Sequence, residues 1–414
     1  MLAIRADMYN KEEKSKQKKG KSLFRKVVEW LHLWLGLVSG ILVVIISVTG
    51  CLFVFQQEVN NWYYHKTLYV TPEQRPVLPL SQLLDKAQAA LGPGKPASYI
   101  TTYTAPDKAW EFSCYSGNDT AITYFGAIKY YEAVYVNPYT GEVTGRIDFK
   151  RNFFSIVKYI HWSLLLNTKY GQPIVGWSTF IFVILLVTGL IMWWPKKWTR
   201  STRQQSFKIK WKASFKRLNY DLHNVLGFYA LIIALVIALT GMVWSFTWFE
   251  AAVYVAASGS TQPPAIKTVQ SVKNNNEVAD IDPLDIAYNK AAGILKGARR
   301  IGVTPAATPD GVHYISGYKG KEVYYGRDEL QFDQYSGALL NRRNDNDKNR
   351  GERLLDMNYD IHVGAIGGLP GKIIAFVISL ICASLPITGF YIWWGKKKKS
   401  KKPVKQAVRV AVSS

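Results

Sequence analysis

Four histidines stand in or beside long apolar runs of the 414-residue chain, where an imidazole is a candidate metal ligand. His32 is followed by a glycine after four residues and by a Thr-Gly pair after seventeen and eighteen residues. His223 has both features at the same distances. His161 and His362 stand 32 and 31 residues before a Trp-Trp pair. This pattern indicates one structural unit that is used twice.

The apolar runs are predicted to be membrane spans, because about 20 apolar residues cross a bilayer core. The order of span, polar segment, histidine-bearing helix and span occurs twice. Basic residues flank the runs, and since such flanks stay on the cytoplasmic side, we expect both termini there. The predicted fold is a membrane α-helical bundle with four principal spans, two short histidine-bearing helices before spans, two α+β outer domains and an internal parallel duplication.

The predicted boundaries follow these changes of composition along the chain. In chain order they are a basic cytoplasmic N-terminus at 1–26, the first span at 27–55, an outer domain at 56–150, a histidine-bearing helix with the second span at 151–194, a basic cytoplasmic loop at 195–218, the third span at 219–250, a second outer domain at 251–353, a histidine-bearing helix with the fourth span at 354–394, and a basic cytoplasmic tail at 395–414.

Each predicted outer domain contains a helix, several strands and a sharp turn. The helix at 79–91 ends at a Gly-Pro-Gly sequence, and the turn at 137–141 reads Asn-Pro-Tyr-Thr-Gly. The second domain echoes this order, with a helix at 283–295 and an Asp-Gln-Tyr-Ser-Gly turn at 333–337. Strand-like runs surround both turns, which indicates small helix-on-sheet modules.

The net charge of +23 is concentrated beside the spans, so it indicates contact with membrane lipid and not with nucleic acid. The chain has three cysteines and no CxxC sequence, which excludes a disulfide framework and covalent haem attachment. It also lacks the GxGxxG, P-loop and HExxH signatures of dinucleotide, phosphate and zinc sites.

The repeat predicts which histidines lie together. Both units begin and end on the same side, so an axis along the membrane normal relates them and places equivalent residues at equal depth. His32 then lies near His223 at the cytoplasmic face, and His161 lies near His362 at the outer face. Two histidines facing each other inside a bundle can hold a haem iron. We therefore predict two b-type haems with these four histidines as axial ligands.

Glycines near the histidines are expected to make room for a flat ring. Gly36 and Gly227 lie one helical turn after His32 and His223 and are assigned this role. Gly189 and Gly389 fit a haem site and plain helix packing equally well.

Other readings of the histidines remain open at this point. They can be structural groups that form hydrogen bonds between helices. A non-haem metal is a weaker alternative, because each pair supplies only two imidazoles, and Asp221 and Asp360, two residues before a histidine, point to another helix face. His65 and His313 have no counterpart in the repeat and are expected at the surface.

Two sets of residues resemble a known family. The turns at 137–141 and 333–337 resemble those of PepSY domains. The histidine-bearing helices, over residues 23–397, resemble the PepSY-associated transmembrane family of bacteria, often called iron-regulated membrane proteins. The matching pairs are Leu31-His32, Ile160-His161, Leu222-His223 and Ile361-His362.

The resemblance implies a function. Members of the family include inner-membrane siderophore reductases that carry b-type haem and reduce ferric siderophores on the periplasmic side. It therefore implies haem ligation by the four histidines, a ferric-siderophore substrate, an electron donor that is cytoplasmic or a quinol, and a multi-pass inner-membrane location with two periplasmic domains. The alternatives are a PepSY regulatory or binding protein without redox activity, and a transporter of iron or siderophore.

Overall fold

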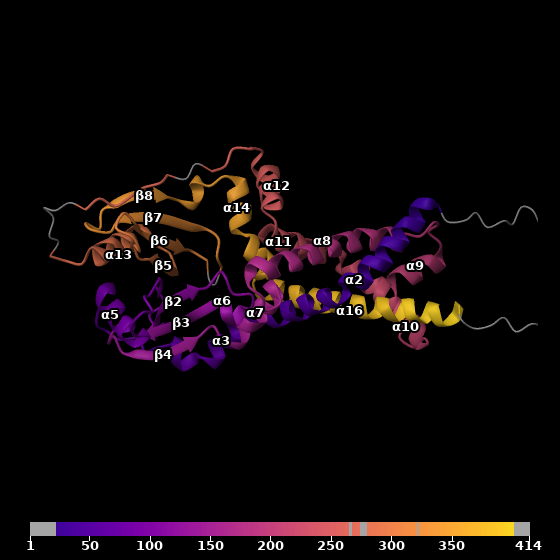
Figure 1. Cartoon of the computed structure of the whole chain (residues 1–414), viewed down its shortest axis with the longest axis horizontal. Coiled ribbons are helices and arrows are strands. Elements are labelled where there is room, and N and C mark those ends of the chain that lie inside the picture. Colours follow the sequence, from indigo (N-terminus) through magenta and orange to yellow (C-terminus); the bar gives the residue numbers. More distant parts are fainter. Residues whose placement is uncertain (1–21, 265–266, 274–279, 321–322, 401–414) are drawn as a thin grey trace, which may run out of the picture.

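The computed structural model of the chain describes residues 22–264, 267–273, 280–320 and 323–400. Of the predicted basic termini, residues 1–21 and 401–414 lie outside the described residues. The described chain forms a helical bundle joined at one end to a β-sheet (Figure 1). We call the bundle end beside the sheet the sheet end, and the opposite one the far end.

In the described part of the chain, four helical runs are long and apolar enough to cross a membrane, so the chain is a membrane protein. Two short helices carry His161 and His362. The bundle elements are α2 (Leu23–Val54), α7 (Phe153–Ser163), α8 (Thr168–Trp193), α10 (Phe215–Asp221), the π-helical turn η1 (Leu222–Leu226), α11 (Gly227–Ser245), α15 (Asn358–His362) and α16 (Gly368–Ser400).

Small residues let the long helices approach closely. The helix α2 packs along both α8 and α16, and α11 packs along the same two helices. A Cβ atom at Gly40 of α2 would lie 3.3 Å from the Pro386 side chain of α16. The centre of the bundle is filled by Ala230, Ala234 and Cys382, while large apolar side chains such as Ile41 face outward. This arrangement holds the histidine-bearing segments in fixed positions.

The strands form one continuous antiparallel sheet in the order β4-β3-β2-β1-β5-β6-β7-β8. Two outer domains were predicted, and the strands of both regions share this sheet, because β1 pairs with β5, with Ile100 opposite Val303. This pairing covers two edges that would otherwise be open. The strands are β1 (Tyr99–Tyr103), β2 (Trp110–Gly117), β3 (Ile128–Val136), β4 (Val143–Asp148), β5 (Arg300–Thr304), β6 (Val312–Tyr318), β7 (Arg327–Asp333) and β8 (Leu339–Arg343).

The two faces of the sheet differ in chemistry. The helices α5 (Leu80–Leu91) and α13 (Pro283–Ile294) pack on one face and bury a shared apolar core. Side chains alternate along a strand, so Phe112 points into this core while its neighbour Glu111 points to the other face. Tyr64 and Leu68 pack on part of that second face, and its tyrosines line a cavity that also contains His161 and His362.

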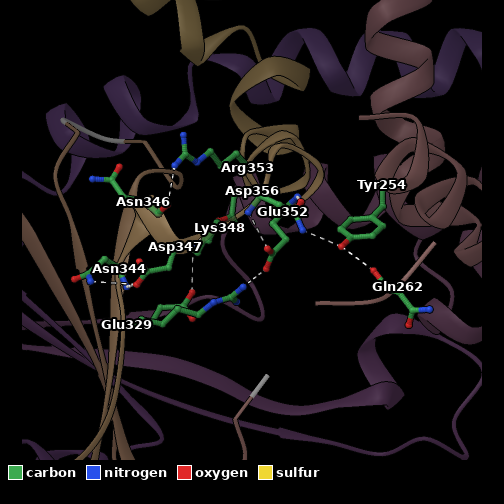
Figure 2. A network of polar contacts seen from close by, with 12 residues as sticks. Tyr254, Gln262, Glu329, Asn344, Asn346, Asp347, Lys348, Glu352, Arg353 and Asp356 are labelled. Atoms are coloured by element: carbon green, nitrogen blue, oxygen red, sulfur yellow. Dashed lines mark hydrogen bonds and ion pairs between the residues drawn. The ribbon is translucent and has the colours of Figure 1, made fainter. Parts of the chain in front are cut away.

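A buried lysine ties the sheet to the segment that leads to His362. The ammonium of Lys348 lies 2.6 Å from Asp356 in α14 (Arg350–Asp356) and 3.3 Å from Glu329 in β7. Figure 2 shows this network, which also includes hydrogen bonds around Tyr254 and Asn344. Because α14 precedes α15, the network fixes the approach of the histidine-bearing helix to the sheet.

Replacing Lys348 by methionine is expected to lower the free energy of unfolding by about 2 kcal/mol, because the part-buried carboxylates of Glu329 and Asp356 lose a buried partner. Thermal unfolding in detergent measures the change. The control is Lys319→Met, which removes a half-exposed partner of Asp328 and should cost less than about 1 kcal/mol. Equal losses of stability in the two variants would contradict this role for Lys348.

Candidate functional site

The four histidines lie in two pairs, one near each end of the bundle. The ring centres of His32 and His223, which we call the inner pair, are 6.3 Å apart. Those of His161 and His362, which we call the outer pair, are 6.0 Å apart. These are the partners that the sequence repeat predicted. His223 lies within the π-helical turn η1, a feature that often accompanies functional sites.

Each outer histidine is held by a threonine of a long helix. His161 Nδ1 lies 3.3 Å from Thr49 Oγ1 and 2.8 Å from the carbonyl oxygen of Ile46. His362 Nδ1 lies 2.9 Å from Thr240 Oγ1, and it too contacts the carbonyl oxygen three residues before that threonine. Since a carbonyl oxygen only accepts, Nδ1 donates a proton and Nε2 is the nitrogen with a free lone pair.

The inner histidines are held in the same way. His32 Nδ1 lies 2.9 Å from Thr188 Oγ1. His223 Nδ1 lies 2.9 Å from Thr388 Oγ1 and 3.1 Å from the carbonyl oxygen of Leu385. A partner of this kind fixes the orientation of a metal-binding imidazole and strengthens it as a ligand.

The glycine after each of these threonines lets an imidazole ring approach the helix closely, because glycine has no side chain. A Cβ atom at Gly50 would lie 3.3 Å from His161 Cε1, closer than most real Cβ contacts. The same closeness recurs at the other three histidines. The contacts are Gly189 with His32 at 3.3 Å, Gly241 with His362 at 3.4 Å, and Gly389 with His223 at 3.2 Å.

Two other glycines, Gly36 and Gly227, were expected to leave room for a flat ring. A Cβ atom there would make ordinary van der Waals contacts with Leu185 and Leu385, at 3.7 and 3.5 Å. The prediction missed the four threonines as histidine partners, although one Thr-Gly pair per histidine was the signal that could have identified them.

A second hydrogen bond ties two of the histidine segments to the threonine-bearing helices. Asn358 lies one helical turn before His362, and its Nδ2 donates to the carbonyl oxygen of Thr240 at 3.1 Å. In the inner pair, Asn219 Nδ2 donates to the carbonyl oxygen of Thr388 at 3.0 Å. Both asparagines are buried, so each pair contains one doubly anchored histidine.

The two aspartates that precede histidines, Asp221 and Asp360, have other partners. Asp221 pairs with Arg217 at 2.9 Å, and Asp360 accepts a hydrogen bond from the Tyr324 backbone at 2.9 Å. Within the part of the chain that the structure describes, no three His, Cys, Asp or Glu side chains gather at one point. The donor set is therefore two neutral imidazoles per site.

This donor set fits an iron porphyrin. An imidazole nitrogen binds a metal ion at about 2 Å, and with that nitrogen roughly 1 Å from the ring centre, two rings on opposite sides of one ion lie about 6 Å apart. Both observed separations have this value. Two axial imidazoles in an apolar bundle match a six-coordinate haem, whose porphyrin supplies the four other ligands.

A cavity of about 1040 Å³ surrounds the outer pair, His161 and His362, and reaches the sheet face opposite α5 and α13. Near the histidines it is lined by apolar side chains such as Ile46, Phe182 and Ile378. Toward the sheet it is lined by polar and aromatic side chains. The cavity thus joins the outer pair to the sheet. The part near the histidines has the apolar lining that a porphyrin requires.

The two remaining histidines lie away from both pairs. His65 is exposed, as predicted, and stacks on Tyr69 with ring centres 4.5 Å apart. His313 was predicted at the surface but is buried in β6. A hydrogen bond from the Ala306 backbone to its Nδ1 satisfies the buried imidazole.

Burial raises the pKa of Glu111, which lines the cavity, although hydrogen bonding by Tyr135 and the charge of Arg300 oppose the shift. A carboxyl with a raised pKa holds its proton to a higher pH in the folded state than in the unfolded chain. The folded chain then binds more protons than the unfolded chain, so this group lowers stability as the pH rises above its unfolded pKa of about 4.

Glu111→Gln is therefore expected to raise the melting temperature at pH 7 and to change it little at pH 4. Gln is neutral at both values, whereas the native carboxyl resists ionisation when buried. Melting curves between pH 4 and 8 measure this difference. Glu142→Gln, at an exposed position on the β3–β4 turn, is the control. A gain of stability that is equal at all pH values would contradict the expectation.

Comparison with known families gives one result for this chain. Residues 29–396 match the model of a family that is described as PepSY-associated TM region. Comparison with curated proteins gave no matching sequence. The family match spans both histidine pairs and the whole sheet.

Proposed function

This chain belongs to the PepSY-associated TM family, and we propose that it is a b-type di-haem membrane protein that reduces a ferric siderophore. The proposal rests on one observation. Four histidines form two pairs about 6 Å apart, and each Nδ1 is held by a threonine on a neighbouring helix. That arrangement leaves Nε2 as the coordinating atom at both sites.

His32 and His223 would hold one haem, and His161 and His362 would hold the other. Bound haem would supply one-electron chemistry at each pair. The threonines orient the imidazoles, and the glycines after them let the imidazole rings approach the helices closely. The surrounding apolar side chains exclude water, which favours a stable six-coordinate site.

The spacing of the two pairs suits transfer across a membrane. His32 and Thr49 are 17 residues apart on α2 (49 − 32), which is about 25 Å at 1.5 Å per residue. Thr49 contacts His161 of the outer pair. One pair therefore lies near each face of an apolar core about 30 Å thick.

The orientation that we propose places both termini in the cytoplasm of a bacterium and the sheet in the periplasm, with the chain in the inner membrane. The basic segment between α8 and α10 supports this, because positive flanks remain cytoplasmic. The electron donor is then a cytoplasmic protein or a quinol at the far end, and the ferric siderophore is the acceptor at the sheet end.

The acceptor reaction is a single-electron reduction of Fe³⁺ to Fe²⁺ within its chelate. Ferrous iron has a lower charge and binds hard oxygen ligands less tightly, so reduction promotes release of the metal. The cavity beside the outer pair gives such a chelate a place within reach of the histidine site.

The proposal is tested by mixing dithionite-reduced protein, freed of excess reductant, with a ferric siderophore under anaerobic conditions. The haem spectrum should return to the oxidised form while a ferrous-specific chelator captures one Fe²⁺ per electron lost. Ferric complexes that leave the spectrum reduced over minutes would rule out the reductase.

A further inference from the structure

The cavity at the sheet end has two walls of different chemistry. His161 and His362 lie on its bundle side, and Glu111, Tyr135 and Arg327 lie on its sheet side. A ligand on the sheet side of the cavity would thus share the cavity with His161 and His362. The charges that face this space decide which ligand it accepts.

Two lysines on the cavity wall pair with no carboxylate of the described residues. Lys158 lies on α7, one turn before His161, and its exposed side chain lines the cavity. Lys108 stands 3.6 Å above the ring of Tyr69. Among the described residues, no carboxylate lies within ion-pair distance of either ammonium group.

The carboxylates on the same wall do not offset these lysines. Asp356 already pairs with Lys348 at 2.6 Å and lies 3.6 Å from Arg327. Burial raises the pKa of Glu111, which disfavours its negative charge. Burial also lowers the pKa of Lys158, which disfavours its ammonium form until an anion beside it favours that charge again.

Tyrosines complete the upper wall and offer hydroxyl donors and ring faces to a ligand rich in oxygen. They come from the sheet and the loop between β6 and β7, from the residue between α3 (Gln56–Tyr63) and α4 (His65–Leu68), and from α7 and α15. Those that line the cavity include Tyr64, Tyr103, Tyr131, Tyr159, Tyr324 and Tyr359.

We propose that this cavity binds ferric chelates of net negative charge, with Lys158 and Lys108 as the residues that select for charge. This inference rests on the proposed function, because the reductase defines the ligand as an iron chelate. The propionate carboxylates of a bound haem share the same chemistry, so the test must separate a chelate from the cofactor.

The test uses gallium(III) complexes, which resemble ferric complexes but accept no electron under these conditions. An anionic gallium tris-catecholate and an uncharged gallium tris-hydroxamate are titrated into the haem-loaded protein, and tryptophan fluorescence reports binding, since Trp162 and Trp244 line the cavity. The native protein should bind the anionic complex at least tenfold more tightly at low salt, and added salt should reduce this preference.

Lys158→Met and Lys108→Met should each weaken binding of the anionic complex about tenfold, with little effect on the uncharged one. Lys129→Met, at an exposed position of β3, is the matched control and should bind as the native protein does. The haem content and absorbance of all variants should stay native.

Equal binding of both gallium complexes by the native protein would overturn the inference. A loss of haem or a shifted haem spectrum in Lys158→Met would overturn it too, because the lysine would then serve the cofactor's carboxylates. These outcomes are independent of electron transfer. A chelate that binds as proposed but never reoxidises the reduced protein would instead refute the proposed function.

Discussion

The His362→Ala variant is expected to purify with about one haem per chain in place of two. Alanine removes one of only two imidazoles at the outer pair, and no cluster of three His, Cys, Asp or Glu side chains among the described residues offers other ligands. The inner pair is about 25 Å away along α2 and should keep its haem. The haem-to-protein ratio, measured as the pyridine haemochrome, gives the result.

The converse variant, His32→Ala, should remove the inner haem and leave the outer one. Its reduced-minus-oxidised spectrum should differ from that of His362→Ala, and the two spectra together should approximate the native spectrum. His65→Ala is the control, because this exposed histidine lies outside both pairs. Loss of both haems from each single variant would argue against two separate sites.

The Thr240→Val variant is expected to retain the outer haem but to hold it about 10- to 100-fold more weakly, the usual effect of removing a partner of a metal ligand. Valine keeps the shape of threonine but lacks the Oγ1 that lies 2.9 Å from His362 Nδ1. The Ile237 carbonyl still accepts from that nitrogen, so the imidazole should stay in place less firmly. Haem transfer to a haem-accepting apoglobin measures the change in release rate.

Thr240→Ser supplies the control for this experiment, since it restores the hydroxyl and should recover most of the native retention. The equivalent change at the inner pair, Thr188→Val, should speed release of the other haem alone. If Val and Ser at position 240 release haem at the same rate, the hydroxyl contributes nothing to the site.

Membrane spans and histidine partners could be predicted from the sequence for a physical reason. Crossing a bilayer demands a long apolar run, and a duplicated chain places equivalent residues at equal depth. His32 and His223 carry the same neighbours at the same distances, which is enough to pair them. The family, too, was predicted from these pairs and is confirmed.

The rest required contacts between segments far apart in the chain. Nothing local to Thr49 shows that its hydroxyl faces His161, 112 residues later. The pairing of β1 with β5 joins residues about two hundred positions apart and places the strands of both predicted domains in one sheet. The strand β8 has a short polar sequence that resembles a loop until β7 lies beside it. Such long-range pairings leave no periodic signal in a single sequence.

The central claim is that each histidine pair holds a haem, and one absorption spectrum tests it most directly. The full chain should be expressed in haem-replete cells, purified in detergent, and scanned before and after dithionite. We expect the bands of a six-coordinate b-type haem that sharpen on reduction, with two haems per chain by pyridine haemochrome. A folded, monodisperse and colourless protein would contradict the account.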